Sequence, residues 1–234
     1  TSAPSGPLGA ASGMSLFLLE PGADGLDWLP RHRTVPAPAA DIGGVRFDTW
    51  VPASARLGPE GAGFGVVHRA LSMSRGGISA FAAGTSNRAW TLASAYAYER
   101  VLYGGPIVEL DPIADHLVRL AAFDRLAMCV SLRAMELLNA LGPRASHAAA
   151  VAKVAACDFA ERAVDEGRRV LGARALVDGP YAQLVQDVPL YGVFDGTRHV
   201  VLEQVASALP RLGRPSPPVS LPGAPRPLEE VVHE

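Results

Sequence analysis

The sequence predicts a mainly α-helical protein, an antiparallel four-helix bundle preceded by a partial β-barrel segment. Long helical stretches rich in alanine, joined by short connections that contain glycine or proline, occupy the middle of the chain. Short apolar runs bounded by turn residues occupy its first quarter. The 234 residues are 49% hydrophobic and 19% charged, which is enough apolar material for a packed core. We therefore expect three parts, at residues 1–58, 59–210 and 211–234.

The first part, residues 1–58, is expected to hold β-strands. Apolar runs at 14–20 and 45–51 are separated by turn residues, among them the proline- and glycine-containing stretches 21–25 and 36–38. A sheet this small is marginally stable when it stands alone. We therefore expect these strands to be part of a barrel whose other strands are not in this chain.

The second part is expected to hold four helices with short connections. They span residues 64–102, 111–142, 146–171 and 195–209. Asp111 and Ser146 have side chains typical of N-cap residues, and Pro112 suits the first helical position. Glycines in the first helix allow close approach of a neighbour or a ligand, and the alanines of the third helix let its neighbours pack tightly against it.

The remaining composition excludes several classes of protein. A net charge of −2 argues against a nucleic-acid partner, and no apolar run is long enough to span a membrane. The six histidines lack the spacing of a metal site, so no metal is expected. Cys129 and Cys157 are expected to be free, buried thiols in a cytoplasmic protein. The proline-rich stretch 211–234 is expected to be extended or mobile.

The chemistry of the chain is concentrated in residues 191–197, Tyr-Gly-Val-Phe-Asp-Gly-Thr. An aspartate at the start of a helix commonly caps the first N–H groups, and Asp195 fits that role. A carboxylate in a water-poor pocket can instead accept a proton from a substrate. The residue alone leaves both roles open.

The order of motifs along the chain resembles that of a known family. The motifs are Gly-Ala-Gly-Phe at 61–64, Ser-Met-Ser-Arg at 72–75, Glu-Arg-Val-Leu-Tyr-Gly-Gly-Pro-Ile at 99–107, Leu-Gly at 171–172 and Phe-Asp-Gly-Thr at 194–197. In this order they resemble the C-terminal helical domain of the acyl-CoA dehydrogenase family across residues 59–210. Residues 1–58 resemble the second half of that family's middle β-domain.

The resemblance implies a flavin-dependent dehydrogenase that introduces an α,β double bond into an acyl thioester, carried by coenzyme A or by an acyl carrier protein. In that family FAD lies between two subunits and takes the β-hydride, while an acidic residue takes the α-proton. Asp195 matches this base, although the family usually has a glutamate, which is one methylene longer. By the same resemblance, Arg75, Ser74 and Gly196 lie near the substrate.

The resemblance also implies a set of FAD-binding residues. They are Arg100, Arg169, Gly172, Thr197 and His199. Arg100 matches an arginine that reaches the FAD pyrophosphate of the neighbouring subunit, and a guanidinium group binds phosphate in a bidentate manner. The chain departs from the family at Ala173 and Ala175, which add bulk where the backbone should approach the cofactor. It departs again at Gln186-Asp187, where the family usually has Arg-Asp.

The resemblance finally implies partners. The family has an N-terminal helical domain and the first half of the β-domain ahead of the matched region, so we expect a partner chain or a longer protein. A homo- or hetero-oligomer such as a dimer of dimers is expected, and an electron-accepting flavoprotein is a candidate partner. Two alternatives to the dehydrogenase stay open: a non-catalytic subunit of a heteromeric complex, and a flavin oxidase or monooxygenase of the same superfamily.

Overall fold

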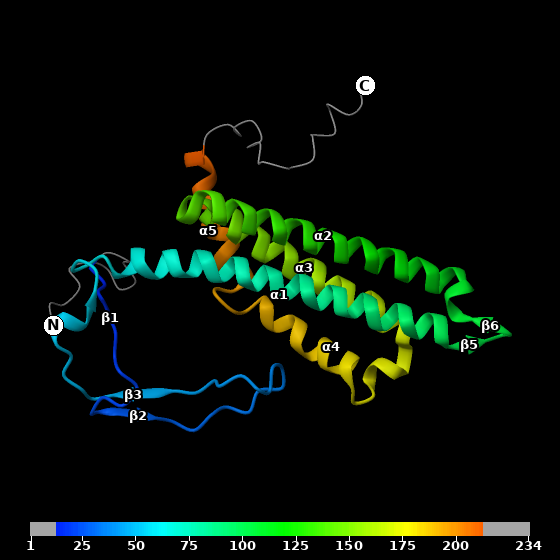
Figure 1. Ribbon diagram of the computed structural model, residues 1–234, viewed down its shortest axis with the longest axis horizontal. Coiled ribbons are helices and arrows are strands. Elements are labelled where there is room, and N and C mark those ends of the chain that lie inside the picture. Colours follow the sequence, from blue (N-terminus) through cyan, green and yellow to red (C-terminus); the bar gives the residue numbers. More distant parts are fainter. Residues whose placement is uncertain (1–12, 213–234) are drawn as a thin grey trace, which may run out of the picture.

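The protein is mainly helical, as the sequence predicts. The structure is a computed structural model that describes residues 13–212 (Figure 1). Three long helices and a shorter one lie side by side with alternating direction, and small open sheets flank them. The predicted fold class is therefore confirmed. The predicted tail from residue 213 onward, and the predicted β segment before residue 13, lie outside the described residues.

The helices begin and end close to glycine and proline residues. Their bounds are α1 (Gly63–Glu99), α2 (Asp111–Leu141), α3 (Ser146–Leu171), α4 (Pro180–Tyr191) and α5 (Arg198–Leu212). The first three agree with the prediction within a few residues. The sequence analysis missed α4, which is only 12 residues long and contains Pro189. It also placed the start of the last helix at Asp195, three residues before α5 begins.

Two predicted N-caps are wrong. Asp111 and Ser146 are the first helical residues of α2 and α3, and neither helix has a side-chain cap hydrogen bond. The positions before them are taken by Leu110 and Ala145, which continue directly from short 3-10 turns. The Ile113 and Ala114 N–H groups of α2 donate to the Leu110 carbonyl, and the Ser146 N–H of α3 donates to the Pro143 carbonyl of the preceding 3-10 turn.

The alanine-rich α3 is the centre of the bundle. It packs against α1, α2, α4 and α5. Its fully or nearly fully buried alanines are Ala149, Ala150, Ala152, Ala156, Ala160 and Ala163. Because an alanine has a small side chain, the neighbouring helices come close to it, as the sequence predicts. On α1, a Cβ atom at Gly76 would come within 2.6 Å of Leu138, so this glycine lets α1 approach α2.

Among the described residues, the β part before α1 consists of two small two-stranded antiparallel sheets. Strands β1 (Leu16–Phe17) and β4 (Arg56–Leu57) pair with each other across the chain, and β2 (Leu26–Trp28) and β3 (Val45–Phe47) form a hairpin. The strands β1 and β3 fall within the predicted runs but are shorter, and β2 and β4 were not predicted. A second hairpin, β5 (Val101–Leu102) with β6 (Gly105–Pro106), joins α1 to α2.

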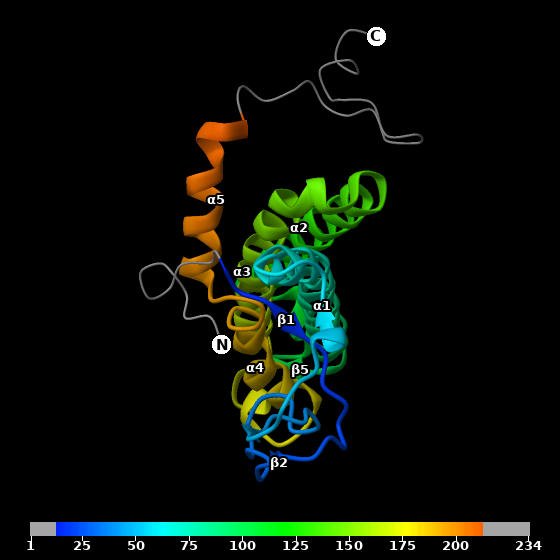
Figure 2. The same ribbon diagram turned by 90° about the vertical axis from the view of Figure 1, so that its left-hand side faces the viewer.

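Two hydrogen bonds connect the β part to the bundle. The Gly63 N–H at the start of α1 donates to the Met14 carbonyl at 2.8 Å. The Ala37 N–H, in the loop between β2 and β3, donates to the Asp187 carboxylate of α4 at 2.7 Å. Asp187 therefore joins the hairpin to α4. Figure 2 shows that α5 runs across the bundle instead of along it, and α5 rests on α3.

Candidate active site

The turn between α4 and α5, residues 192–197, contains the predicted base. Asp195 has φ +54° and Gly196 has φ +103°, so two consecutive residues adopt left-handed backbone. Such a conformation is uncommon for a residue with a side chain, although aspartate tolerates it better than most. It also prevents Asp195 from being part of a helix. The turn needs partners that hold it in this conformation.

Arg75 of α1 is the first of these partners. Its side chain is only 2% exposed, and Nε donates a hydrogen bond to the Asp195 carbonyl at 3.2 Å. Burial lowers the pKa of Arg75, and the nearby Asp195 charge acts in the opposite direction. Arg75 is therefore a buried contact of the turn rather than a solvated surface arginine.

Lys153 of α3 is the second partner, and the sequence analysis missed it. It is 1% exposed, and its ammonium group donates a hydrogen bond to the Gly196 carbonyl. Burial lowers the pKa of Lys153; Cys157 raises it, the positive charge of Arg75 lowers it, and Asp195 raises it. A signal was available in the sequence: Lys153 is the sole lysine of this chain and lies in its most alanine-rich helix.

Two buried cations from different helices thus hold two consecutive carbonyl groups of the turn. The side chain of Asp195 is half-buried, and its charge interacts with both cations. Within residues 13–212 the Asp195 carboxylate has no hydrogen-bond or ion-pair partner, so its oxygens are free to accept a proton. A fixed backbone with a free carboxylate is an arrangement suited to general base chemistry.

Thr197 and His199 lie at or next to this turn, whereas Ser74 lies on α1. Thr197 lies just before α5, with its hydroxyl 3.4 Å from the ring nitrogens of His199. Ser74 precedes Arg75 on α1, but its side chain is exposed and donates to the Leu71 carbonyl at 3.2 Å. Neighbouring helical positions point about 100° apart. Ser74 therefore does not face the Asp195 turn.

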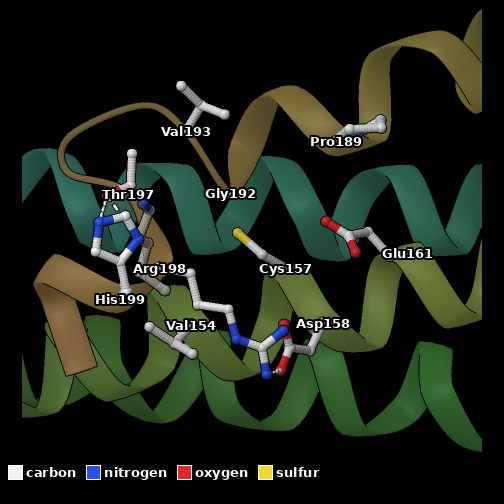
Figure 3. A pocket seen from close by; sticks show the side chains of 11 residues that line it. Val154, Cys157, Asp158, Glu161, Pro189, Gly192, Val193, Thr197, Arg198 and His199 are labelled. Carbon is white, nitrogen blue, oxygen red and sulfur yellow. Dashed lines mark hydrogen bonds and ion pairs between the residues drawn. The ribbon is translucent and has the colours of Figure 1, made fainter.

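A pocket of about 370 Å³ lies between α3 and the α4–α5 turn (Figure 3). Its lining is Lys153, Val154, Cys157, Asp158, Glu161, Pro189, Gly192, Val193, Thr197, Arg198 and His199. Burial raises the pKa of the Cys157 thiol to about 12, and burial followed by the charge of Asp158 raises the pKa of Glu161. Arg198 extends to Asp158 at 2.5 Å. Gly192, Val193 and Thr197 of the turn line the pocket, whereas Asp195 does not.

The two cysteines differ from the prediction in one respect. Both are free, as expected, and Cys157 is buried, but Cys129 is exposed on α2. The described residues contain no group of His, Cys, Asp and Glu that could hold a metal ion. None of the described helices has a stretch long and apolar enough to cross a membrane.

The remaining predicted residues lie at the opposite end of the bundle, where α1 and α3 end (Figure 1). Arg100 is exposed and, among the described residues, has no side-chain hydrogen bond or ion pair. Arg169 is exposed and donates to Asp165 at 2.8 and 3.1 Å. Gly172 ends α3 with φ +57°. Within one chain the structure therefore separates these three residues from Asp195.

Of the two alanines that depart from the family pattern, Ala173 and Ala175, only Ala173 adds bulk at the surface. Ala175 is 1% exposed and packs in the bundle core, so its methyl group adds no bulk at the surface. Ala173 is exposed and does add a methyl group there. Gln186 precedes Asp187, whose carboxylate binds the Ala37 N–H and the Gln183 side chain.

The chain is similar to several known proteins. A family model described as "Acyl-CoA dehydrogenase, C-terminal domain" matches residues 61–209. The chain is 27% identical over 206 residues to cyclohex-1-ene-1-carbonyl-CoA dehydrogenase of Geobacter metallireducens, covering 87% of this chain and 54% of that protein. It is 28% identical over 190 residues to an acyl-CoA dehydrogenase of Bacillus subtilis, covering 80% and 50%.

A solved structure is similar over the same region. Butyryl-CoA dehydrogenase from Megasphaera elsdenii matches with a TM-score of 0.83 and 26% identity, covering 88% of this chain and 54% of that one. The chain thus spans about half the length of the curated relatives it matches.

Proposed function

Because this chain belongs to the acyl-CoA dehydrogenase family, we propose that it forms the C-terminal part of a flavin-dependent enzyme that introduces an α,β double bond into an acyl thioester. The observation that carries this proposal is the turn at Asp195. A carboxylate without a partner among residues 13–212 stands on a backbone that Arg75 and Lys153 hold from two helices.

In this proposal Asp195 is the base of the reaction. One of its oxygens takes the proton from the α-carbon, and the electron pair of the broken C–H bond becomes part of the new double bond. The acidity of that carbon depends on polarisation of the thioester carbonyl. Arg75 holds the Asp195 carbonyl, and the half-buried carboxylate stays without a hydrogen-bond partner among residues 13–212. FAD, when bound, supplies the two-electron acceptor for the β-hydride.

The residues of this chain fit such a cofactor. Arg100 is an exposed guanidinium without a partner among the described residues, and such a group suits a diphosphate. Thr197 and His199, at the start of α5, offer a hydroxyl and an imidazole near a helix N-terminus, which favours an anion. Arg169 is shared with Asp165 and would have to exchange that partner. Because Arg100 and Asp195 lie at opposite ends of the bundle, we propose that Arg100 serves the cofactor of a neighbouring subunit in an oligomer.

The substitution Asp195→Asn tests the role of the base. In the intact flavoprotein assembly, we expect wild type to lose its flavin absorbance near 450 nm when butyryl-CoA or octanoyl-CoA is added without oxygen. Asp195→Asn keeps the flavin but should not bleach it within the same time, because an amide cannot accept the α-proton. Asp158→Asn, on α3 and paired with Arg198, is the matched control and should bleach normally. Bleaching by Asp195→Asn at the wild-type rate would remove Asp195 from this role.

The same assembly distinguishes the alternative functions. A flavin-free assembly would favour a non-catalytic subunit. A flavin that is reduced by the thioester and then reoxidised rapidly by air, with hydrogen peroxide as product, would favour an oxidase. We expect slow reoxidation by oxygen and fast reoxidation by an electron-accepting flavoprotein. An acyl carrier protein thioester tested beside the coenzyme A thioester identifies the carrier.

A further inference from the structure

The sole lysine of the chain is buried next to the turn that carries the proposed base. We propose that Lys153 is a positioning residue for Asp195, an inference that rests on the proposed function. From α3 Lys153 holds the Gly196 carbonyl and thereby fixes the turn that carries the Asp195 carboxylate.

The backbone on either side of Gly196 is held at two points. The peptide group before Gly196 carries the Asp195 carbonyl, which Arg75 holds, and the peptide group after it carries the Gly196 carbonyl, which Lys153 holds. Glycine is the residue with the greatest conformational freedom. Without Lys153 only one of the two peptide groups would be held, and the turn could rotate about Gly196.

Burial of the Lys153 ammonium group is unfavourable in free energy. An ammonium group that is 99% buried loses its hydration, which is expensive unless a hydrogen bond and a nearby negative charge compensate. Here the Gly196 carbonyl accepts a hydrogen bond from the ammonium group, Cys157 and then Asp195 act electrostatically in its favour, and Arg75 is repulsive. Among residues 13–212 Lys153 forms no salt bridge, so its hydrogen bond to the turn is its main polar contact.

The Lys153 side chain starts from a rigid part of the fold. Lys153 lies 43 residues before Gly196, on the central helix, among alanines that are themselves fully buried. A side chain that starts from such a helix has a fixed origin, so its ammonium group is a fixed point for the turn. Arg75 provides the corresponding fixed point on α1.

The test is the substitution Lys153→Met in the intact flavoprotein assembly, because methionine keeps most of the volume and removes the donor. We expect kcat to fall roughly 10- to 100-fold, as for a misplacement of about 1 Å, with KM changed less than about threefold. The kinetic isotope effect for the active acyl thioester deuterated at the α-carbon should rise, because proton removal becomes slower than other steps. Lys153→Arg keeps a cationic donor and should restore part of kcat.

The matched control is Cys157→Ala, one helical turn further along α3 and lining the same pocket. It should leave kcat and the isotope effect unchanged within about twofold. A Lys153→Met enzyme with wild-type kcat would overturn the proposal. So would a fall in activity that only follows the loss of folded protein, with an unchanged isotope effect. If Lys153→Met does not accumulate as folded protein, Lys153→Gln is measured in its place under the same criteria.

Hydrogen exchange separates this inference from the proposed function. The backbone amide of Val201, which donates to the Thr197 carbonyl at 3.0 Å, should exchange at least tenfold faster in Lys153→Met than in wild type or Cys157→Ala. An assembly that shows no flavin reduction would refute the proposed function, and the exchange rates would still decide whether Lys153 holds the turn. Equal exchange rates in all three proteins would refute the inference even if the enzyme is an active dehydrogenase.

Discussion

The two ends of the helical bundle use basic residues in opposite ways. At the Asp195 end, Arg75 and Lys153 are 2% and 1% exposed and donate to backbone carbonyls of one turn. At the far end, Arg100 and Arg169 are exposed, and the one pairing among them is with the carboxylate of Asp165 on the same helix.

This difference shows how burial decides what a cation can do. A buried cation must find its hydrogen-bond acceptors within the protein, and here these acceptors are backbone carbonyls. An exposed cation gains little from a surface ion pair and remains available to a ligand. The Asp195 end is therefore expected to be sensitive to any change of side chain, whereas changes at the far end should affect binding and leave folding intact.

The largest expected effect concerns the reactivity of the thiol beside Lys153. Burial raises the pKa of Cys157 from its ordinary value of 9.0 to about 12, so at any pH below 9 the reactive thiolate is roughly 1000-fold rarer than in the unfolded chain. With iodoacetamide at pH 8, Cys157 should react on the order of 1000-fold more slowly in the native protein than in denaturant. Mass spectrometry of the two cysteine peptides measures both rates, and exposed Cys129 checks the reagent. Equal native rates at the two cysteines would show that the Asp195 end is open.

A smaller but still large effect is expected for Arg75→Met. The change removes the donor to the Asp195 carbonyl and one of the two buried positive charges near Asp195, at a cost of roughly 3 kcal/mol in the free energy of unfolding. Denaturant unfolding measures this loss. Arg100→Met is the matched control and should change stability by less than about 0.5 kcal/mol. If both variants lose the same stability, the contrast between the two ends is wrong.

Gly196→Ala, at the residue after Asp195, should lower the free energy of unfolding. Alanine at φ +103° is strained, and its Cβ would lie 3.2 Å from Val201 and 3.5 Å from Arg75, so we expect a loss of about 1–2 kcal/mol. Gly77→Ala, on α1 with open space around the new Cβ, is the control and should gain up to about 1 kcal/mol through helix propensity. Thermal unfolding of the pair should therefore show shifts of opposite sign.

The sequence predicted the long elements of this molecule better than its site. The helices α1 to α3 are long and end at turn residues, so their pattern could be read. The helix α4 is 12 residues long with an internal proline, so its sequence pattern does not distinguish it from a connecting loop. The left-handed backbone at Asp195 could not be predicted, because local preference disfavours it and only contacts with distant helices stabilise it.

The candidate site shows the same limit. Asp195, Gly196 and Arg75 were selected through a resemblance, and the structure brings them together. Lys153 was missed because its contact with Gly196 depends on how α3 packs against the turn, which no local pattern encodes. The sequence does show that Lys153 is the sole lysine among twenty arginines. Because lysine and arginine are not interchangeable, this indicates a position that requires a lysine.

The smallest effects on stability are expected at the far end, where they test the availability of the exposed arginines. Arg169→Ala breaks an exposed pair with Asp165 and should change the free energy of unfolding by less than about 0.5 kcal/mol, as should Arg100→Ala.

The effects of Arg100→Ala and Arg169→Ala on flavin retention should differ, because Arg100 has no partner to give up among the described residues, whereas Arg169 must leave Asp165. We expect Arg100→Ala to weaken flavin binding about tenfold or more, and Arg169→Ala to weaken it less. Recovery of flavin fluorescence on dilution of the assembly measures both. A larger effect at Arg169 would mean that the Asp165 pair orients Arg169 for the cofactor instead of competing with it.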